Sequence, residues 1–170
     1  MRLESHKNII SKLIRSFLVF AVLLKSAKEA GRTVRKANKY KMKGGVALFD
    51  RYPQTVYPGI NDGPKIREVL VDKLPRVLRP FGLLMARWEE RIISKAASNS
   101  PDIVIKLMLP PEESIRRKPF ENYEMVKRKH EIIKAITFEE ATVYEVDATQ
   151  NYQEELVAIK NILWKNICKL

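Results

Sequence analysis

The stretch SPDIVIKLMLPPEESIRRKP, residues 100–119, decides the fold class of this chain. Its apolar, β-branched centre, residues 102–109, predicts a buried strand. Pro110 and Pro111 end that strand, and because proline suits the first turn of a helix, residues 111–118 are predicted to begin one. A strand that passes directly into a helix indicates one half of a β-α-β unit, whose strands are parallel.

The segments on either side continue this alternation. Downstream, we expect a helix with a basic face at 123–136, a strand at 141–148 and an amphipathic helix at 152–167. Upstream, we expect a helix at 8–30 ended by Gly31, a basic helix at 32–43, a buried strand VALF at 46–49, a Pro- and Gly-rich loop at 53–64, and amphipathic helices at 65–74 and 81–97. The predicted fold is α/β, with three layers, a parallel sheet between helices and a single domain over residues 1–170.

The charge of the chain is concentrated at its N-terminal end. Residues 1–51 contain 13 Lys and Arg against 3 acids, whereas the remainder contains 19 against 17, for a net charge of +12. Such an excess favours an anionic partner, which could be nucleic acid, membrane phosphate or a nucleotide. Only Tyr40 interleaves the basic run 32–43, so base stacking has little support there and nucleic acid is the weaker expectation.

The cysteine and histidine content restricts the chemistry further. A single cysteine, Cys168, and two histidines argue against a structural zinc site and indicate a reducing, intracellular and cytoplasmic setting. The apolar run FLVFAVLL, residues 17–24, has eight residues where a membrane span needs about 20. We therefore expect a buried helix, with surface association with a membrane as a lesser alternative and no span.

Polar residues follow each predicted strand. Asp50 and Arg51 come after VALF, the basic clusters 116–119 and 127–130 after the second strand, and Asp147, Ala148 and Thr149 lie at the end of the third. Ligands of open α/β sheets bind beyond the carboxyl ends of the strands, so these residues are candidates for a site. The alternatives are a structural ion pair at 50–51, solvated helix faces for the basic clusters and a helix cap at 147–150.

Three of these segments together resemble the thymidylate kinases. VALFDRYP resembles their Asp-Arg-Tyr strand end, SPDIVIKLMLPPEESIRRKP their strand and flap entry, and VYEVDATQNYQEELVAIKNILW their last strand, turn and closing helix. The resemblance implies a P-loop kinase fold with ATP as donor, Mg²⁺ as cofactor, a flap-like region at 111–136 and a possible homodimer. The implied activity is transfer of the ATP γ-phosphoryl group to a phosphate or hydroxyl of a nucleotide or other phosphorylated small molecule.

The resemblance also implies roles for individual residues. Asp50 would hold the metal and act at the acceptor, Arg51 would hold the acceptor's phosphate, and Arg116 and Arg117 would steady the transferred group. Lys118 and the turn at Asp147, Ala148 and Thr149 would bind ATP. The loop 53–64 differs from the thymidylate-binding loop, so the acceptor stays open, with Tyr52, Gln54, Asn61 and Asp62 as its expected contacts.

One part of the kinase pattern is missing from the sequence. No GxxxxGK[ST] run occurs, and the paired glycines Gly44 and Gly45 precede a predicted strand rather than follow one. We therefore expect the chain to lack the first strand and phosphate loop, to be truncated and not to be competent for ATP donation as written. The alternative is a non-catalytic protein that binds polyanions or nucleic acid through its basic N-terminal segment.

Overall fold

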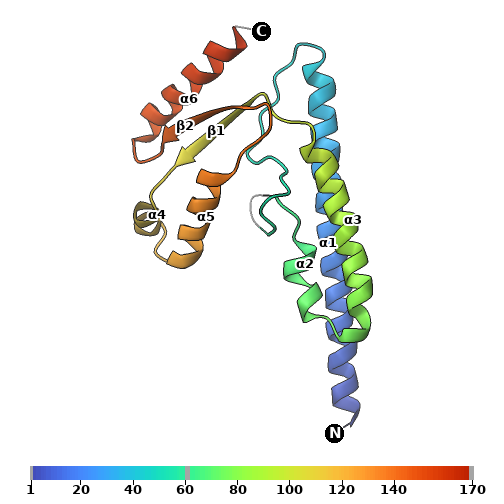
Figure 1. Ribbon diagram of the computed structural model, residues 1–170. Coiled ribbons are helices and arrows are strands. Elements are labelled where there is room, and N and C mark those ends of the chain that lie inside the picture. Colours follow the sequence, from blue (N-terminus) through green and yellow to red (C-terminus); the bar gives the residue numbers. More distant parts are fainter. Residues whose placement is uncertain (1, 60–61, 169–170) are drawn as a thin grey trace. The chain divides into compact units, whose positions relative to one another are not determined.

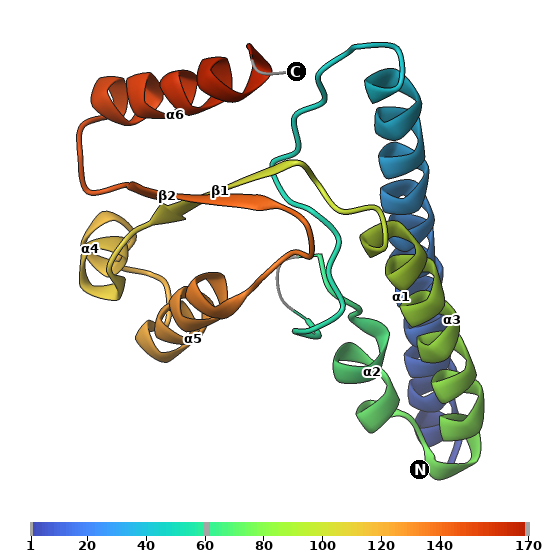
Figure 2. The same cartoon turned by 45° about the horizontal axis from the view of Figure 1, so that its top comes forward.

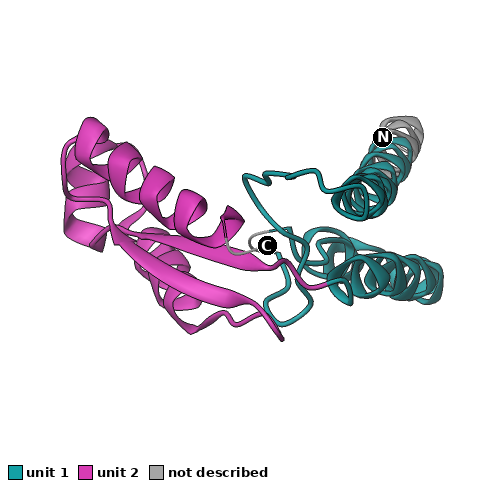
Figure 3. Ribbon diagram, turned by 90° about the horizontal axis from the view of Figure 1, so that it is seen from above, with its two compact units in different colours: residues 1–99 teal, residues 100–170 magenta. Residues whose placement is uncertain are grey.

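The computed structural model describes residues 2–59 and 62–168, and for residues 2–13 the backbone only. The chain divides into two compact units, residues 1–99 and 100–170 (Figure 3). Each unit has its own secondary structure and its own buried residues, and the two are described separately. The single domain expected over 1–170 stays a prediction.

Unit 1 is built on two long helices, α1 (Arg2–Lys41) and α3 (Arg79–Ala97), which lie side by side (Figure 1). They run in the same direction, because Phe20 meets Phe81 edge to face and Lys28 meets Trp88. Between them in sequence come α2 (Ile66–Val69) and the short 3₁₀ helices η1 (Val71–Lys73) and η2 (Arg76–Leu78). The core of the unit consists of Phe20, Ile66, Leu70, Val71, Leu74 and Ala86.

The expected break at Gly31 was wrong, since α1 continues through it to Lys41. Glycine in a helix interior costs only about 1 kcal/mol relative to alanine, and packing can offset that cost. Gly31 lies against α3, where a Cβ would stand 3.7 Å from Ile92 Cγ2, and Val34 in the next turn is 1% exposed. Burial on both sides of the glycine therefore holds the helix together.

The expected strand at Val46–Phe49 was also wrong. Within the described ranges the sheet contains β1 and β2 alone, and residues 46–49 form no ladder. Leu48 is 77% exposed, so this apolar run is not buried on two faces. A strand is stabilised by backbone hydrogen bonds to a neighbouring strand. Without such a neighbour, the preference of these apolar residues for extended backbone is not sufficient to form a strand.

The helix expected at 65–74 is shorter than predicted. It breaks into α2 and η1 at Leu70, whose backbone leaves the helical conformation, and η1 ends where Leu74 takes an extended conformation before Pro75. Proline disfavours a helical conformation of the residue before it. The result is a compact corner of two short turns that packs on α3 rather than a third long helix.

Unit 2 confirms the predicted β-α-β order. Strand β1 (Ile103–Met108) leads into α4 (Pro111–Arg117) and α5 (Tyr123–Ala135), and β2 (Thr142–Asp147) leads into α6 (Tyr152–Ile167). The strands are parallel and adjacent, with Ile103 opposite Thr142 and Met108 opposite Asp147. Figure 2 shows α6 on one face of the strands and α4 and α5 on the other, so the unit has three layers. The fold class α/β with a parallel sheet is confirmed in this form.

A buried lysine ties two of these layers together. Lys106, in the middle of β1, is 7% exposed, and its Nζ donates a hydrogen bond of 2.9 Å to the carbonyl of Lys134 in the last turn of α5. An ammonium at a helix C-terminus meets carbonyl groups that lack helical partners, which stabilises both. β1 and α5 are therefore joined by a charged contact as well as by apolar packing.

The apolar run 17–24 lies inside α1 and is only partly buried. Phe20, Leu23 and Leu24 belong to the core or pack against it, whereas Phe17, Leu18 and Val22 are exposed. None of the helices in the described part of the chain is both long and apolar enough to cross a membrane.

Candidate functional site

The carboxyl ends of β1 and β2 lie side by side, because Met108 and Asp147 are partners in the last step of the ladder. The pairing extends one residue further, since the Ala148 N–H donates to the Met108 carbonyl over 3.0 Å. Beyond these ends the chain enters α4 on one side and the loop 147–150 on the other. This is the edge at which ligands of α/β sheets bind.

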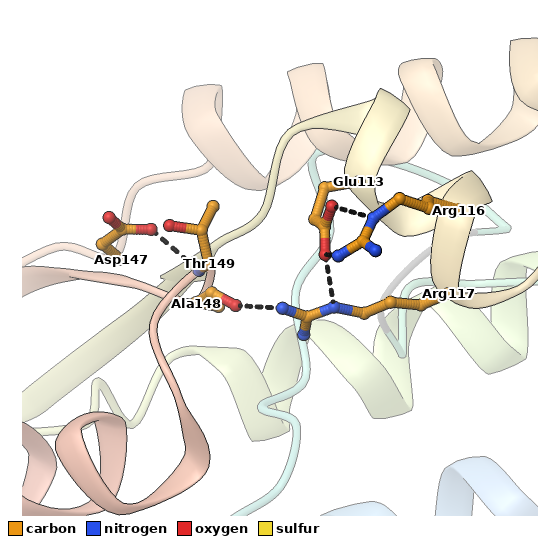
Figure 4. A network of polar contacts seen from close by, with 6 residues as sticks. All are labelled: Glu113, Arg116, Arg117, Asp147, Ala148 and Thr149. Carbon is orange, nitrogen blue, oxygen red and sulfur yellow. Dashed lines mark hydrogen bonds and ion pairs between the residues drawn. The ribbon is translucent and has the colours of Figure 1, made fainter.

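Arg116 and Arg117 are held at this edge by one carboxylate, as Figure 4 shows. Arg116 donates two hydrogen bonds to Glu113, from Nε and Nη2, each 2.7 Å long, and Arg117 Nε donates a third of 2.9 Å. Arg117 Nη2 reaches across to the carbonyl of Ala148 at 3.1 Å. The flap arginines and the loop after β2, expected to share a site, are thus brought together in the structure.

The charges of this cluster are strongly coupled. Hydrogen bonds from Arg116, and then from Arg117, lower the pKa of Glu113 to about 2, while the same contact raises the pKa of Arg116. Glu113 is therefore ionised throughout the physiological range and fixes both guanidinium groups. Two cations on one anion leave a net positive charge, and Arg116 remains 76% exposed.

The loop after β2 is a turn closed by its own aspartate. The Thr149 N–H donates to Asp147 Oδ1 over 2.8 Å, and this bond, followed by one from the Thr149 side chain, lowers the pKa of Asp147. The helix cap considered for 147–150 is supplied instead by Asn151, whose Oδ1 accepts from the N–H groups of Gln153 and Glu154. Asp147 and Thr149 are therefore not needed to cap α6.

The remaining contacts of this edge join α4 to α5. Tyr123 donates to Glu112 over 2.8 Å, and His130 Nδ1 lies 3.0 Å from the Leu109 carbonyl, which accepts. Lys118 lies 3.9 Å from Glu121 and is 72% exposed. The pKa of Glu112 is lowered by its own backbone N–H and then by Tyr123, and Glu112 in turn raises the pKa of Tyr123.

The candidates of unit 1 lie in irregular backbone after Phe49. Asp50 and Arg51 form an ion pair of 3.8 Å, and both are exposed, Asp50 at 97%. Tyr52 donates a hydrogen bond to the Asn99 carbonyl and packs edge to face on Phe49, with ring centroids 5.2 Å apart. The ion pair considered as the alternative for Asp50 and Arg51 is therefore present, although exposed pairs of this kind contribute little to stability.

Two further acceptor candidates are engaged within the loop 53–64. Gln54 is 3% exposed, and its amide both donates to the Tyr57 carbonyl and accepts from the Tyr57 N–H, each at 2.8 Å. Asp62 has a φ of 58° and pairs with Lys65 at 3.8 Å. Asn61 lies outside the described residues. Gln54 thus shapes the loop, and its amide does not present itself to a ligand.

The described residues do not form a metal centre. In the described part of the chain no three His, Cys, Asp or Glu side chains gather in a way that could hold an ion. Asp50, the expected ligand, has an arginine rather than a second carboxylate beside it. Since Mg²⁺ is bound through carboxylates and substrate phosphates, these residues alone do not fit the ion, and no step is derived through it.

Two acids that shape these sites were missed in the sequence. Glu113 precedes the two arginines by three and four residues, the spacing at which helix side chains meet, so the signal was present. Glu89 is 2% exposed and accepts hydrogen bonds from the N–H groups of Ile66 and Lys65, at 2.7 and 3.0 Å. In the sequence it is one of two adjacent glutamates on an amphipathic helix, and nothing there distinguishes it.

The chain is similar to two curated proteins, each described as "Uncharacterized ATP-binding protein YghR", from Escherichia coli strains K12 and CFT073. Each is 27% identical over 124 residues, which cover 72% of this chain and 47% of the relative. The chain therefore spans about half the length of the curated relatives that it matches. No family model and no solved structure matches it.

Proposed function

We propose that unit 2 supplies the cationic flap and the loop of a nucleotide site, and that the chain belongs to a nucleotide kinase of thymidylate kinase type. The observation that carries this proposal is the link from Glu113 through Arg117 to the Ala148 carbonyl, which gathers two guanidinium groups at the carboxyl end of a parallel sheet. The name of the similar proteins, which describes ATP binding, supports the same class of ligand.

Each residue has a defined task in this proposal. Arg116 and Arg117, preorganised by Glu113, bind phosphate oxygens of ATP, because guanidinium groups match phosphate geometry. Lys118 adds an exposed charge beside them, and the turn at Asp147, Ala148 and Thr149 contacts the rest of the nucleotide. Fixed cations of this kind stabilise the charge of a phosphoryl group in transfer without reorganising during the step.

In the transfer itself, the bond between the γ-phosphorus and its bridging oxygen breaks while an acceptor oxygen bonds to that phosphorus. The resemblance implies that Arg51 binds the acceptor's phosphate and that Asp50 takes the proton where the acceptor is a hydroxyl, and these two roles stay expectations from the sequence. Mg²⁺ enters the proposal only as the companion of the nucleotide's phosphates. The acceptor is a nucleotide or another phosphorylated small molecule.

The test is equilibrium dialysis of the 170-residue chain against radiolabelled ATP with MgCl₂. We expect saturable binding that weakens by at least about tenfold in the double variant Arg116→Ala/Arg117→Ala, since two charge-assisted contacts are lost. The matched control is Lys160→Ala/Lys165→Ala, which removes the same charge from the exposed side of α6. Absence of saturable binding, or equal losses in both double variants, would refute the proposal.

A further inference from the structure

A basic cleft of about 700 Å³ runs between α1 and α3 within unit 1, the two helices that lie side by side in Figures 1 and 3. Three of its cations, Lys28, Arg32 and Arg35, come from α1, and Lys95 comes from α3. Trp88 of α3 supplies an aromatic wall. These five residues, defined here as the basic cleft, come from two segments that are about 60 residues apart along the chain.

The cations of α1 form a continuous stripe. Lys28, Arg32 and Arg35 are followed by Lys39, and steps of four, three and four residues keep all of them on one face of a helix. They span about 16 Å along α1, at 1.5 Å per residue. The stripe therefore continues past the cleft toward the C-terminal end of the helix.

The positive charge of the basic cleft is not compensated. None of the described side chains that line it is acidic. Over residues 14–59 and 62–168, the structure gives no ion pair to Arg32, Arg35 or Lys95. Four neighbouring cations without a counterion repel one another and create a field that attracts a polyanion.

Trp88 distinguishes this cleft from a solvated basic face. Its side chain is 45% exposed, and Lys28 Nζ lies 4.6 Å from the centre of its ring. An exposed indole next to arginines offers a π-face on which a base can stack, and basic grooves with such aromatics are the means by which proteins hold unpaired strands. In a duplex the faces of the bases are covered by their neighbours, so a ring of this kind favours a single strand.

We propose that the basic cleft binds single-stranded nucleic acid, with Arg32, Arg35 and Lys95 on the phosphates and Trp88 stacked on a base. Around the basic run 32–43 the sequence offers only Tyr40 as an aromatic residue, and α3 supplies a second aromatic, Trp88, to the cleft. This inference does not depend on the proposed nucleotide site, because none of the residues of the basic cleft has a role in that site.

The experiment is fluorescence anisotropy of the full chain with labelled oligothymidylate and oligouridylate of about 15 nucleotides, in about 50 mM salt. We expect micromolar or tighter binding, weakened roughly 5- to 150-fold by Trp88→Ala and largely retained in Trp88→Phe, which keeps a ring. Arg32→Ala/Arg35→Ala should weaken binding by at least about tenfold and reduce the slope of log K against log salt by about 1.4. The ratio of the two affinities tells DNA from RNA as the preferred strand.

The matched control is Arg67→Ala/Arg76→Ala, which removes two exposed arginines of the same unit from α2 and η2, outside the cleft. It should leave the affinity within about twofold, because long-range charge alone is screened at this salt. A second readout is the fluorescence of Trp88 in the Trp164→Phe background, which should be quenched by the unlabelled strand. Wild-type affinity in Trp88→Ala, equal losses in the two arginine double variants, or equal binding of a duplex would each overturn the proposal.

Discussion

At the scale of single residues, Glu113 gives the most direct test of the arginine cluster. Its pKa is lowered to about 2 by the hydrogen bonds from Arg116 and Arg117, in that order. Because the folded pKa lies below the ordinary value of 4.5, the contribution of this carboxylate to stability is present above that value and is lost as the pH falls toward 2.

We expect a ¹³C carboxyl NMR titration of Glu113 to show a midpoint near 2 in the wild type. In Arg116→Ala the midpoint should rise toward the ordinary value, since the guanidinium that contributes most is gone. Lys160→Ala should leave it unchanged. A wild-type midpoint near the ordinary value would mean that the two arginines do not hold Glu113 in solution.

The sequence identified individual side chains by their position after strands. Arg116, Arg117 and the turn at 147–149 were found in this way, and the structure places them together in unit 2. The sequence could not reveal that the Gln54 amide forms hydrogen bonds with the backbone of Tyr57, because these bonds depend on how the backbone of the loop turns back. Residue type and order in the sequence predict which side chains are candidates for a site. Whether a side chain is free to contact a ligand depends on its partners in the folded chain.

At the scale of elements, Glu89 connects α3 to the start of α2. Its carboxylate accepts from the buried N–H of Ile66 and the partly buried N–H of Lys65, and burial of the carboxylate, the largest effect, raises its pKa. Truncation in Glu89→Ala would leave both donors without partners, so we expect a loss of about 1–3 kcal/mol in the free energy of unfolding. Urea denaturation at neutral pH measures it, with Glu90→Ala as the neighbouring control.

The isosteric change Glu89→Gln should behave differently, because the amide oxygen still accepts both bonds. A carboxyl whose folded pKa is raised stabilises the fold less as the pH rises from the ordinary value through the folded one. The stability of Glu89→Gln relative to wild type should therefore increase as the pH rises above the ordinary value of 4.5. A pH-independent difference would show that the buried carboxylate carries no such penalty.

Elements were predicted well where the local pattern and the packing agreed. The strands and helices of unit 2 follow apolar runs and the prolines at 110 and 111, and all of them were found. The errors in unit 1 have a common cause, since Gly31 and the run at 46–49 were judged by local preference. In the structure, contact with α3 overrides the glycine, and the absence of a paired strand leaves the apolar run irregular.

At the scale of the whole molecule, the charge divides with the two units. Residues 1–99 contain 21 Lys and Arg and 8 Asp and Glu, a net charge of +13, whereas residues 100–170 contain 11 and 12, a net charge of −1. The skew was visible in the sequence, and Asn99, Ser100 and Pro101 marked a break after the helix, but a break of this kind does not by itself distinguish a boundary between units from a loop. The homodimer likewise stays a prediction, for which the exposed Phe17, Leu18 and Val22 of α1 are the candidate surface.

This division makes a quantitative prediction about salt. If Arg32, Arg35 and Lys95 contact phosphates of a single strand, the slope of log K against log salt should be about −2.1. Affinity for the oligonucleotide should then fall roughly 20-fold between about 50 and 200 mM salt. Anisotropy titrations across this range measure the slope, and Lys160→Ala/Lys165→Ala in the acidic unit should leave it unchanged. A slope near zero would mean that unit 1, in spite of its charge, makes no phosphate contacts, and a slope much steeper than about −3 would extend the contact surface along the whole stripe of α1.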